Sequence, residues 1–141
     1  QKTIGAVVKQ LVESKNTTKA FKAKLTKEDK KKYKEHLKST KEIAKKIEGL
    51  IALYLGKIDK RQGITRNPEI TVNRRLGAAY SYVRSRSGNQ TSTEKQLVNQ
   101  FKATYAEALK KVNTFFDTDW KTYKASLEKI EISPFKEIKK F

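Results

Sequence analysis

Apolar residues recur at steps of three and four along most of this chain, a spacing that is typical of amphipathic helices. The longest regular stripes predict one helix from about residue 27 to 57 and another from about residue 92 to 130. The stripe of the first comprises Tyr33, Leu37, Thr40, Ala44, Ile47, Ile51 and Tyr54. The stripe of the second comprises Leu97, Phe101, Tyr105, Ala108, Val112, Phe115, Trp120, Tyr123, Leu127 and Ile130. We therefore expect two long helices, each with one apolar face.

Two further segments carry shorter apolar faces. The first face comprises Ile4, Val7, Val8, Leu11 and Val12. Its pattern weakens between Ser14 and Thr18, and the helix then resumes or continues through Leu25. The other face comprises Val72, Leu76, Ala79, Tyr80 and Val83, on a helix that runs to about Arg86. Gly77 and Ala78 on that helix suit the close approach of a neighbouring helix.

Residues that cap helices divide the segments. Thr26, followed by Asp29, indicates the start of the second helix. Asn67–Glu69 combines an N-cap residue, a proline at the first helical position and an acidic first turn, which predicts that the third helix starts there. Thr91 and Glu94 form a capping box, so we expect the fourth helix to begin near residue 92.

The fourth helix contains one irregular step. Phe115 and Trp120 are five residues apart, and the extra residue falls in the sequence FFDTDW. We expect Asp117–Asp119 either to kink the helix or to cap a new one. The helix ends at Ser133–Pro134, because the residue before a proline disfavours helix. The tail then packs back on the helices through Phe135, Ile138 and Phe141. These elements predict a single domain over residues 1–141, an all-α, elongated antiparallel bundle of three to four helices with a short packed C-terminal tail.

The charge of the chain raises anionic partners as a possibility. It has 33 Lys plus Arg against 15 Asp plus Glu, a net charge of +18, and 27 of the basic residues are Lys. Strongly basic proteins bind nucleic acid or anionic surfaces. The lysines are interspersed with acidic residues, however, and no nucleic-acid recognition motif is present. The longest apolar run, residues 49–56, is too short for a membrane span, which needs about 20 residues.

Two groups of basic residues are candidate contacts for an anion or a partner. Lys34, Lys38, Lys41 and Lys45 form a ridge beside the apolar stripe of the second helix. The ridge is either an anion-binding surface or the solvated flank of a helix, with acidic neighbours that weaken its field. Four of the six arginines, Arg61, Arg66, Arg74 and Arg75, lie in DKRQGITRNPEITVNRR, residues 59–75. We expect Arg61 and Arg66 to hold the connector between two helices in place, because the arginine fork suits such anchoring.

The sequence carries no motif for chemistry. It has no cysteine, which excludes a disulfide framework and thiolate metal sites. His36 is the only histidine and lacks the convergent partners that a metal site needs. Phosphate-binding glycine loops are also missing. We therefore predict no catalytic residues, no cofactor and no metal, and expect that the chain is not an enzyme.

Three stretches resemble a known group of proteins: LGKIDKRQGITRNPEITV (55–72), NTFFDTDWKTYK (113–124) and ISPFKEIKKF (132–141). They are similar to the C-terminal helical region of exported Bacteroidetes proteins with BNR-type, sortilin-like β-propellers, which are labelled glycosyl hydrolases. The resemblance implies a C-terminal fragment of a larger secreted or cell-envelope protein, with any hydrolase activity in a propeller outside this chain. The likeness covers most of the chain, and no catalytic residue of that group can be carried onto it. This sequence is richer in lysine than the resemblance implies.

The leading hypothesis is a non-catalytic accessory helical domain that acts as a structural or protein-interaction module. Its partner would be another protein or the propeller of the same parent chain. The alternative is a basic helical bundle that binds nucleic acid or another polyanion, which would place the chain in the cytoplasm. A third hypothesis is an enzyme that acts through a pair of carboxylates.

Overall fold

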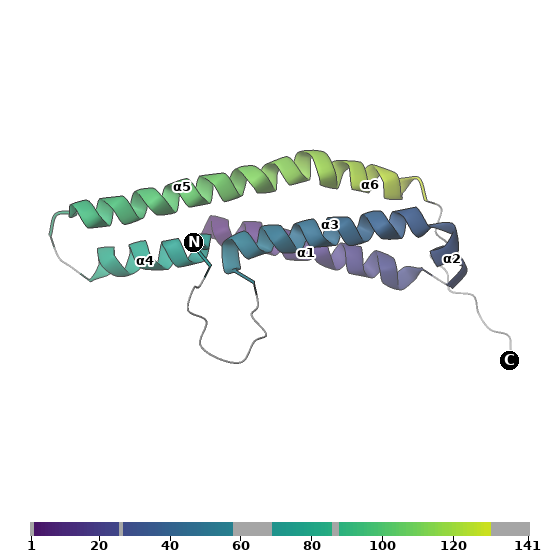
Figure 1. Ribbon diagram of the computed structural model, residues 1–141, viewed down its shortest axis with the longest axis horizontal. Coiled ribbons are helices and arrows are strands. Elements are labelled where there is room, and N and C mark those ends of the chain that lie inside the picture. The colour runs from purple at the N-terminus through teal and green to yellow at the C-terminus, as the bar shows by residue number, and fades with distance from the viewer. Residues whose placement is uncertain (1, 26, 58–68, 86–87, 131–141) are drawn as a thin grey trace.

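A computed structural model describes residues 2–25, 27–57, 69–85 and 88–130 of the chain. Within these residues every regular element is helical, and the helices pack against one another along a common axis, which confirms the predicted all-α bundle. The tail at residues 131–141, and with it the predicted end at Ser133–Pro134, lies outside the described residues. The bundle is elongated, with α4 and α3 following one another along one side of the long α5–α6 helix (Figure 1).

Helix α1 (Lys2–Lys24) runs without interruption through Ser14 and Thr18, where the sequence predicted a weak point. Both side chains are buried, at 8% and 1% exposure. The Thr18 hydroxyl donates to the carbonyl of Lys15 at 2.7 Å, so this polar group finds its partner inside its own helix. The predicted apolar face is only partly right, because Ile4 and Leu11 are buried while Val12 is 41% exposed.

The predicted second helix is broken at Tyr33 into α2 (Lys27–Lys32) and α3 (Lys34–Leu55). The backbone of Tyr33 leaves helical geometry, at φ −107° and ψ 35°. The sequence of α2, KEDKKK, has no apolar residue that could pack on the core, so core packing does not hold its axis in line with α3. The predicted cap Thr26 lies outside the described residues.

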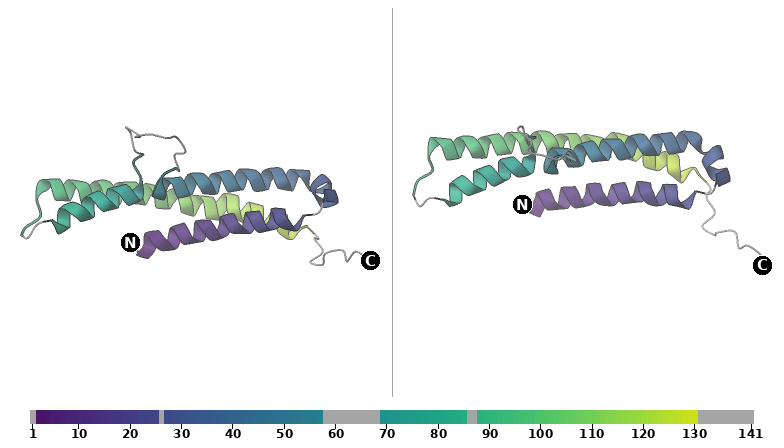
Figure 2. Two further views of the ribbon diagram at one scale, coloured as in Figure 1. Left: turned by 90° about the horizontal axis from the view of Figure 1, so that it is seen from below. Right: turned by 60° about the horizontal axis from the view of Figure 1, so that its bottom comes forward.

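Antiparallel packing of α1 on α3 forms one half of the bundle (Figure 2). The stripe of α3 buries Thr40, Ile47 and Tyr54 as predicted, and also Ile43, which the predicted stripe omitted. Gly56 ends α3 with a positive φ of 86°, a conformation that favours glycine. A methyl group added at Gly56 would lie 3.5 Å from the Thr71 side chain, which shows how closely the end of α3 approaches the start of α4.

Helix α4 (Val72–Arg84) begins later than predicted, because Thr71 and not Asn67 is its N-cap. The Thr71 hydroxyl accepts the Arg74 backbone N–H at 3.1 Å. Glu69 does not lie in the first helical turn. Its carboxylate accepts the Lys57 backbone N–H at 3.1 Å and so joins the two ends of the connector. The predicted close approach at Gly77 is also wrong, since an added methyl group there would meet nothing within 4 Å.

Helix α5 (Ser92–Phe115) begins at the predicted residue. Its capping box is complete: the Thr91 hydroxyl accepts the Glu94 N–H at 3.3 Å, and the Glu94 carboxylate accepts the Thr91 N–H at 2.7 Å. The irregular step is a π-helical turn, η1 (Phe116–Trp120), which passes directly into α6 (Lys121–Glu128). Together α5, η1 and α6 make one rod of about 55 Å at about 1.5 Å per residue.

One apolar core joins all these helices except α2. Its buried members are Ile4, Leu11, Ile43, Ile47, Tyr54, Val72, Ala108, Val112, Phe115 and Tyr123. Every one of them except Ile43 belongs to a stripe predicted from the sequence. The π-turn makes this possible, because its additional residue rotates α6 so that Tyr123 faces α3 again.

Candidate interaction surfaces

The four candidate lysines Lys34, Lys38, Lys41 and Lys45 are all exposed on α3. They lie in the half of α3 that adjoins α2 (Figure 1). Within the described part of the chain none of the four forms an ion pair. Glu35 and Glu42 are exposed in the same half of the helix, as expected from the sequence. The structure thus confirms an exposed lysine ridge with acidic neighbours and leaves its binding role a prediction.

The candidate arginines have different settings. Arg61 and Arg66 lie outside the described residues, so their anchoring role stays a prediction. Arg74 is exposed in the first turn of α4. Arg75 is half-buried and its guanidinium donates to the side-chain oxygen of Gln100 on α5. Arg75 therefore ties α4 to α5. The start of α4 lies at the opposite end of α3 from the lysine ridge, so Arg74 and Arg75 do not form one surface with the four lysines.

The far end of α4 exposes apolar side chains. Tyr80 and Tyr82 are each 53% exposed and Val83 is 42% exposed, although Tyr80 and Val83 were predicted to face the core. Steps of seven and four put Val83 on the same helical face as Val72 and Ala79, which are buried. Val72 is the first residue of α4, and that end of α4 lies beside the end of α3. Val83 is in the last turn, where α5 is the only described helix beside α4 (Figures 1 and 2).

The residue types at this end of α4 differ from those of the rest of the chain. Helix α4 contains no lysine, although the chain has 27. Its exposed positions instead include the two tyrosines, Arg74 and Arg84, and the Arg84 guanidinium lies 5.9 Å from the centre of the Tyr80 ring. Tyrosine and arginine are enriched at protein–protein interfaces, and lysine is depleted there. Steps of three and four put Tyr80, Val83 and Arg84 on one flank of α4, and we call these three residues the α4 end patch. Tyr82, two residues from Tyr80, lies on the other flank.

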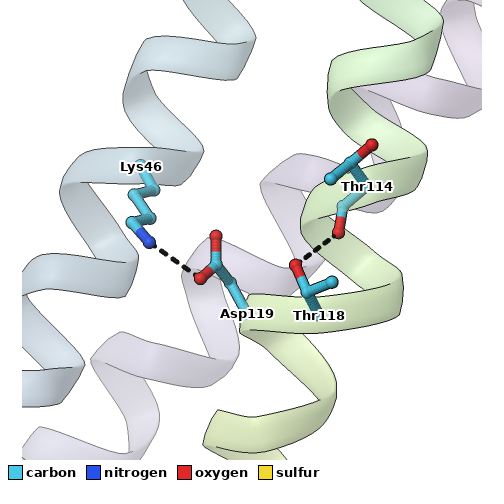
Figure 3. A network of polar contacts seen from close by, with 4 residues as sticks. All are labelled: Lys46, Thr114, Thr118 and Asp119. Atoms are coloured by element: carbon cyan, nitrogen blue, oxygen red, sulfur yellow. Dashed lines mark hydrogen bonds and ion pairs between the residues drawn. The ribbon is translucent and has the colours of Figure 1, made fainter.

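A second local feature surrounds the π-turn (Figure 3). The Lys46 ammonium of α3 lies 2.8 Å from the Asp119 carboxylate, and the Thr118 hydroxyl donates to the Thr114 carbonyl at 2.7 Å. The expectation that Asp117–Asp119 cap a new helix is wrong, because helical geometry continues through η1 into α6 with no side-chain cap. The irregularity expected there is the π-turn itself, and a kink stays a prediction. Lys46 and Asp119 were not among the predicted contacts. The five-residue step between Phe115 and Trp120 was the available signal for this site.

Two other polar contacts connect helices that are distant in sequence. Lys15 of α1 and Glu48 of α3 form an ion pair at 2.8 Å, and this hydrogen bond and the charge of Lys15 lower the pKa of Glu48. In the core, the Tyr123 hydroxyl donates to the Thr40 hydroxyl at 3.1 Å. Burial raises the pKa of Tyr123 and also that of Tyr54. These contacts fix the relative positions of α1, α3 and α6.

Reactive groups do not gather in the described residues. No group of three or more His, Cys, Asp or Glu side chains there could hold a metal ion. His36 is half-buried and its ring lies edge-on to Tyr33, with 5.9 Å between the ring centres. In the same residues, no helix combines the length and the apolar character that a bilayer crossing requires.

Comparisons of the chain with models of protein families, with curated proteins and with solved structures found no match. The resemblance to the propeller-associated helical region therefore stays a prediction. The function must be argued from the surfaces of the bundle itself.

Proposed function

We propose that this chain is a non-catalytic accessory helical domain that binds another protein through the α4 end patch. The observation that carries the proposal is the exposure of Tyr80 and Val83 where, among the described residues, α4 has only α5 as a neighbour. A two-helix segment buries less apolar surface than the three-helix half of the bundle. A partner that covered these side chains would complete the packing there.

The rest of the bundle supports a structural role. The α5–α6 rod is held at several levels, by α4 through Arg75 and Gln100 and by α3 through Lys46 and Asp119. Such a rod acts as a rigid spacer that presents the patch at one end. The resemblance to exported propeller proteins suggests the partner: a β-propeller of the same parent polypeptide, in a secreted or cell-envelope protein. Any hydrolase activity would then belong to the propeller.

The proposal is tested by titrating the purified chain with the propeller that the resemblance places in the same polypeptide, by isothermal titration calorimetry. We expect the double variant Tyr80→Ser, Val83→Ser to bind at least 10-fold more weakly, because hot-spot side chains typically contribute about 2 kcal/mol or more. Its matched control is Lys38→Ser, Lys41→Ser on the exposed ridge of α3, which should bind like the unaltered chain. Equal binding by both double variants would refute the patch. Glycosidase turnover by the chain alone, lost on substitution of its own carboxylates, would refute the non-catalytic role.

A second function is favoured by the exposed lysine ridge. Four ammonium groups at steps of four and three can follow a phosphate backbone, so the alternative is binding of nucleic acid or another polyanion. Contact with four phosphates predicts that affinity for a duplex falls about 100-fold between 50 and 200 mM salt. Fluorescence anisotropy with a labelled 20-base-pair duplex measures this, and replacing Lys34, Lys38, Lys41 and Lys45 by Glu should abolish it. If the unaltered chain has no salt-sensitive affinity at low ionic strength, the alternative fails.

A further inference from the structure

A groove of about 560 Å³ lies between α3 and the junction of α5 with the π-turn. Its volume falls within the roughly 300–1,000 Å³ of small-molecule sites. Phe115 is 4% exposed and Leu50 is half-buried, so these two side chains form the apolar floor. The exposed side chains of Lys46, Lys110 and Lys111 lie around it.

Two local features open this groove. Gly49 lines it from α3, and a methyl group added there would meet nothing within 4 Å. Glycine in a helix interior is unfavourable relative to alanine, so the missing side chain has a cost that packing does not explain. On the other wall, η1 inserts its additional residue directly after Phe115. Single π-turns inside α-helices are frequently found at functional sites.

The charges around the groove define its ligand. Three lysines and two carboxylates line it, a net charge of +1. Lys46 pairs with Asp119 at 2.8 Å and Lys111 pairs with Glu107 at 2.6 Å. Among the described residues only Lys110 of the three lysines has no acidic partner. A ligand with one negative charge would pair with Lys110, whereas a polyanion would meet repulsion from the two carboxylates.

We infer that this groove binds a small amphipathic monoanion, an organic carboxylate with an apolar chain that lies on Leu50 and Phe115 and a head group that pairs with Lys110. The site is separate from the α4 end patch, which lies on another helix. Failure of the test below would therefore leave the protein-interaction proposal standing.

Trp120 provides the readout. It is the only tryptophan of the chain, and its ring centre lies 6.3 Å from that of Phe115 in the groove floor. The probes are decanoate and decyltrimethylammonium, which carry unbranched alkyl chains of nearly equal length and differ in the sign of the head group. We expect decanoate to change Trp120 fluorescence saturably in 150 mM salt and the cation to cause no saturable change. Equal responses to both probes would overturn the inference.

Two pairs of variants locate the binding. Gly49→Leu fills the groove and should weaken decanoate binding at least 10-fold, whereas Gly77→Leu, at a helical glycine outside the groove with equally open surroundings, should leave it within twofold. Lys110→Gln should weaken binding at least fivefold, and Lys102→Gln, the same change of charge on exposed α5 surface, should leave it within twofold. If Lys110→Gln and Lys102→Gln weaken decanoate binding equally, the inference is overturned. That pair changes only exposed side chains, so it decides the matter even if Gly49→Leu fails to fold.

Discussion

The hydrogen bond between Tyr123 and Thr40 gives a sharp test of how α6 is held on α3. Tyr123 is 3% exposed and Thr40 is fully buried. The Tyr123 hydroxyl donates to Thr40 Oγ1 at 3.1 Å, and Thr40 Oγ1 in turn donates to the carbonyl of His36 at 2.6 Å. The Tyr123 hydroxyl has no other hydrogen-bond partner among the described residues. The substitutions Tyr123→Phe and Thr40→Val should therefore lower the free energy of unfolding by different amounts.

Tyr123→Phe removes one hydrogen bond but leaves Thr40 paired with His36, so we expect a loss of about 0.5–1.5 kcal/mol in the free energy of unfolding. Thr40→Val leaves the buried Tyr123 hydroxyl without an acceptor, and such a group costs about 1–3 kcal/mol. The double variant removes both hydroxyls and should be nearly as stable as the unaltered chain, or at most about 1 kcal/mol weaker. The two single losses together should therefore exceed the double loss by about 2.5 kcal/mol at the middle of these ranges, and by at least about 0.5 kcal/mol.

Urea unfolding followed by circular dichroism at 222 nm measures these differences, with unchanged m-values as the check that each variant unfolds from the same compact state. The control cycle combines Thr40→Val with Tyr54→Phe. Tyr54 is also fully buried, and its hydroxyl has no hydrogen-bond partner among the described residues. It lies about 21 Å along α3 from Thr40, at about 1.5 Å per residue.

In the control cycle, the changes in the free energy of unfolding caused by Thr40→Val and Tyr54→Phe should add to that of the double variant within about 0.5 kcal/mol, as expected for distant sites. If the Thr40 and Tyr123 substitutions are additive to the same degree, the hydrogen bond does not couple α3 and α6 and the reasoning fails. Tyr54→Phe alone should not destabilise the chain, because it removes a buried hydroxyl that has no partner. A loss of more than about 1 kcal/mol would show that this hydroxyl is bonded in solution.

Three further predictions concern pH, a glycine and a cap. Burial raises the pKa of Tyr54, so its neutral form stabilises the fold below about pH 10, and this contribution is lost as pH rises further. In urea titrations, the free energy of unfolding of Tyr54→Phe should therefore rise relative to that of the unaltered chain between about pH 9 and 11. A difference that stays constant over this range would contradict the prediction. Gly49→Ala and its control Gly77→Ala should each raise stability by about 0.5–1 kcal/mol in thermal unfolding, since neither added methyl group meets a neighbour. If Gly49→Ala alone lowers stability, α3 cannot accept a side chain at this position. Thr91→Ala should cost about 1 kcal/mol and Thr91→Ser far less, because serine restores the capping hydroxyl; equal losses would exclude the capping box as the cause.

Much of this bundle follows from residues that are close together in sequence. The capping box of α5 needs only Thr91 and Glu94, which is why its start was predicted to the residue. The five-residue step from Phe115 to Trp120 marked the π-turn, although the sequence did not reveal its geometry. The exposed lysine ridge also follows from helical spacing, because residues beside a single apolar stripe must face water.

Contacts between distant segments decided the rest. The sequence predicted that α4 starts at Asn67, but its N-cap is Thr71, where the end of α3 meets the start of α4 and the Glu69 carboxylate binds the Lys57 backbone N–H. Ser14 and Thr18 look like a break in α1, but packing on α3 buries them and the helix continues. Tyr80 and Val83 have the spacing of core residues, yet they are exposed because α3 ends before it reaches them.

The same division applies to the candidate sites. Helical periodicity states which side chains share a face, but not which neighbour covers that face, since this depends on where the other helices begin and end. The Lys46–Asp119 pair and the groove at Gly49 arise between elements far apart in the chain, and the α4 end patch is exposed because α3 ends before it reaches those residues. Local residue pattern therefore determined most of the helices, the cap of α5 and the exposed lysines. The packing of distant helices decided where α4 starts, which of its apolar residues stay exposed and where the groove lies, because a helical face is covered only where another helix runs beside it.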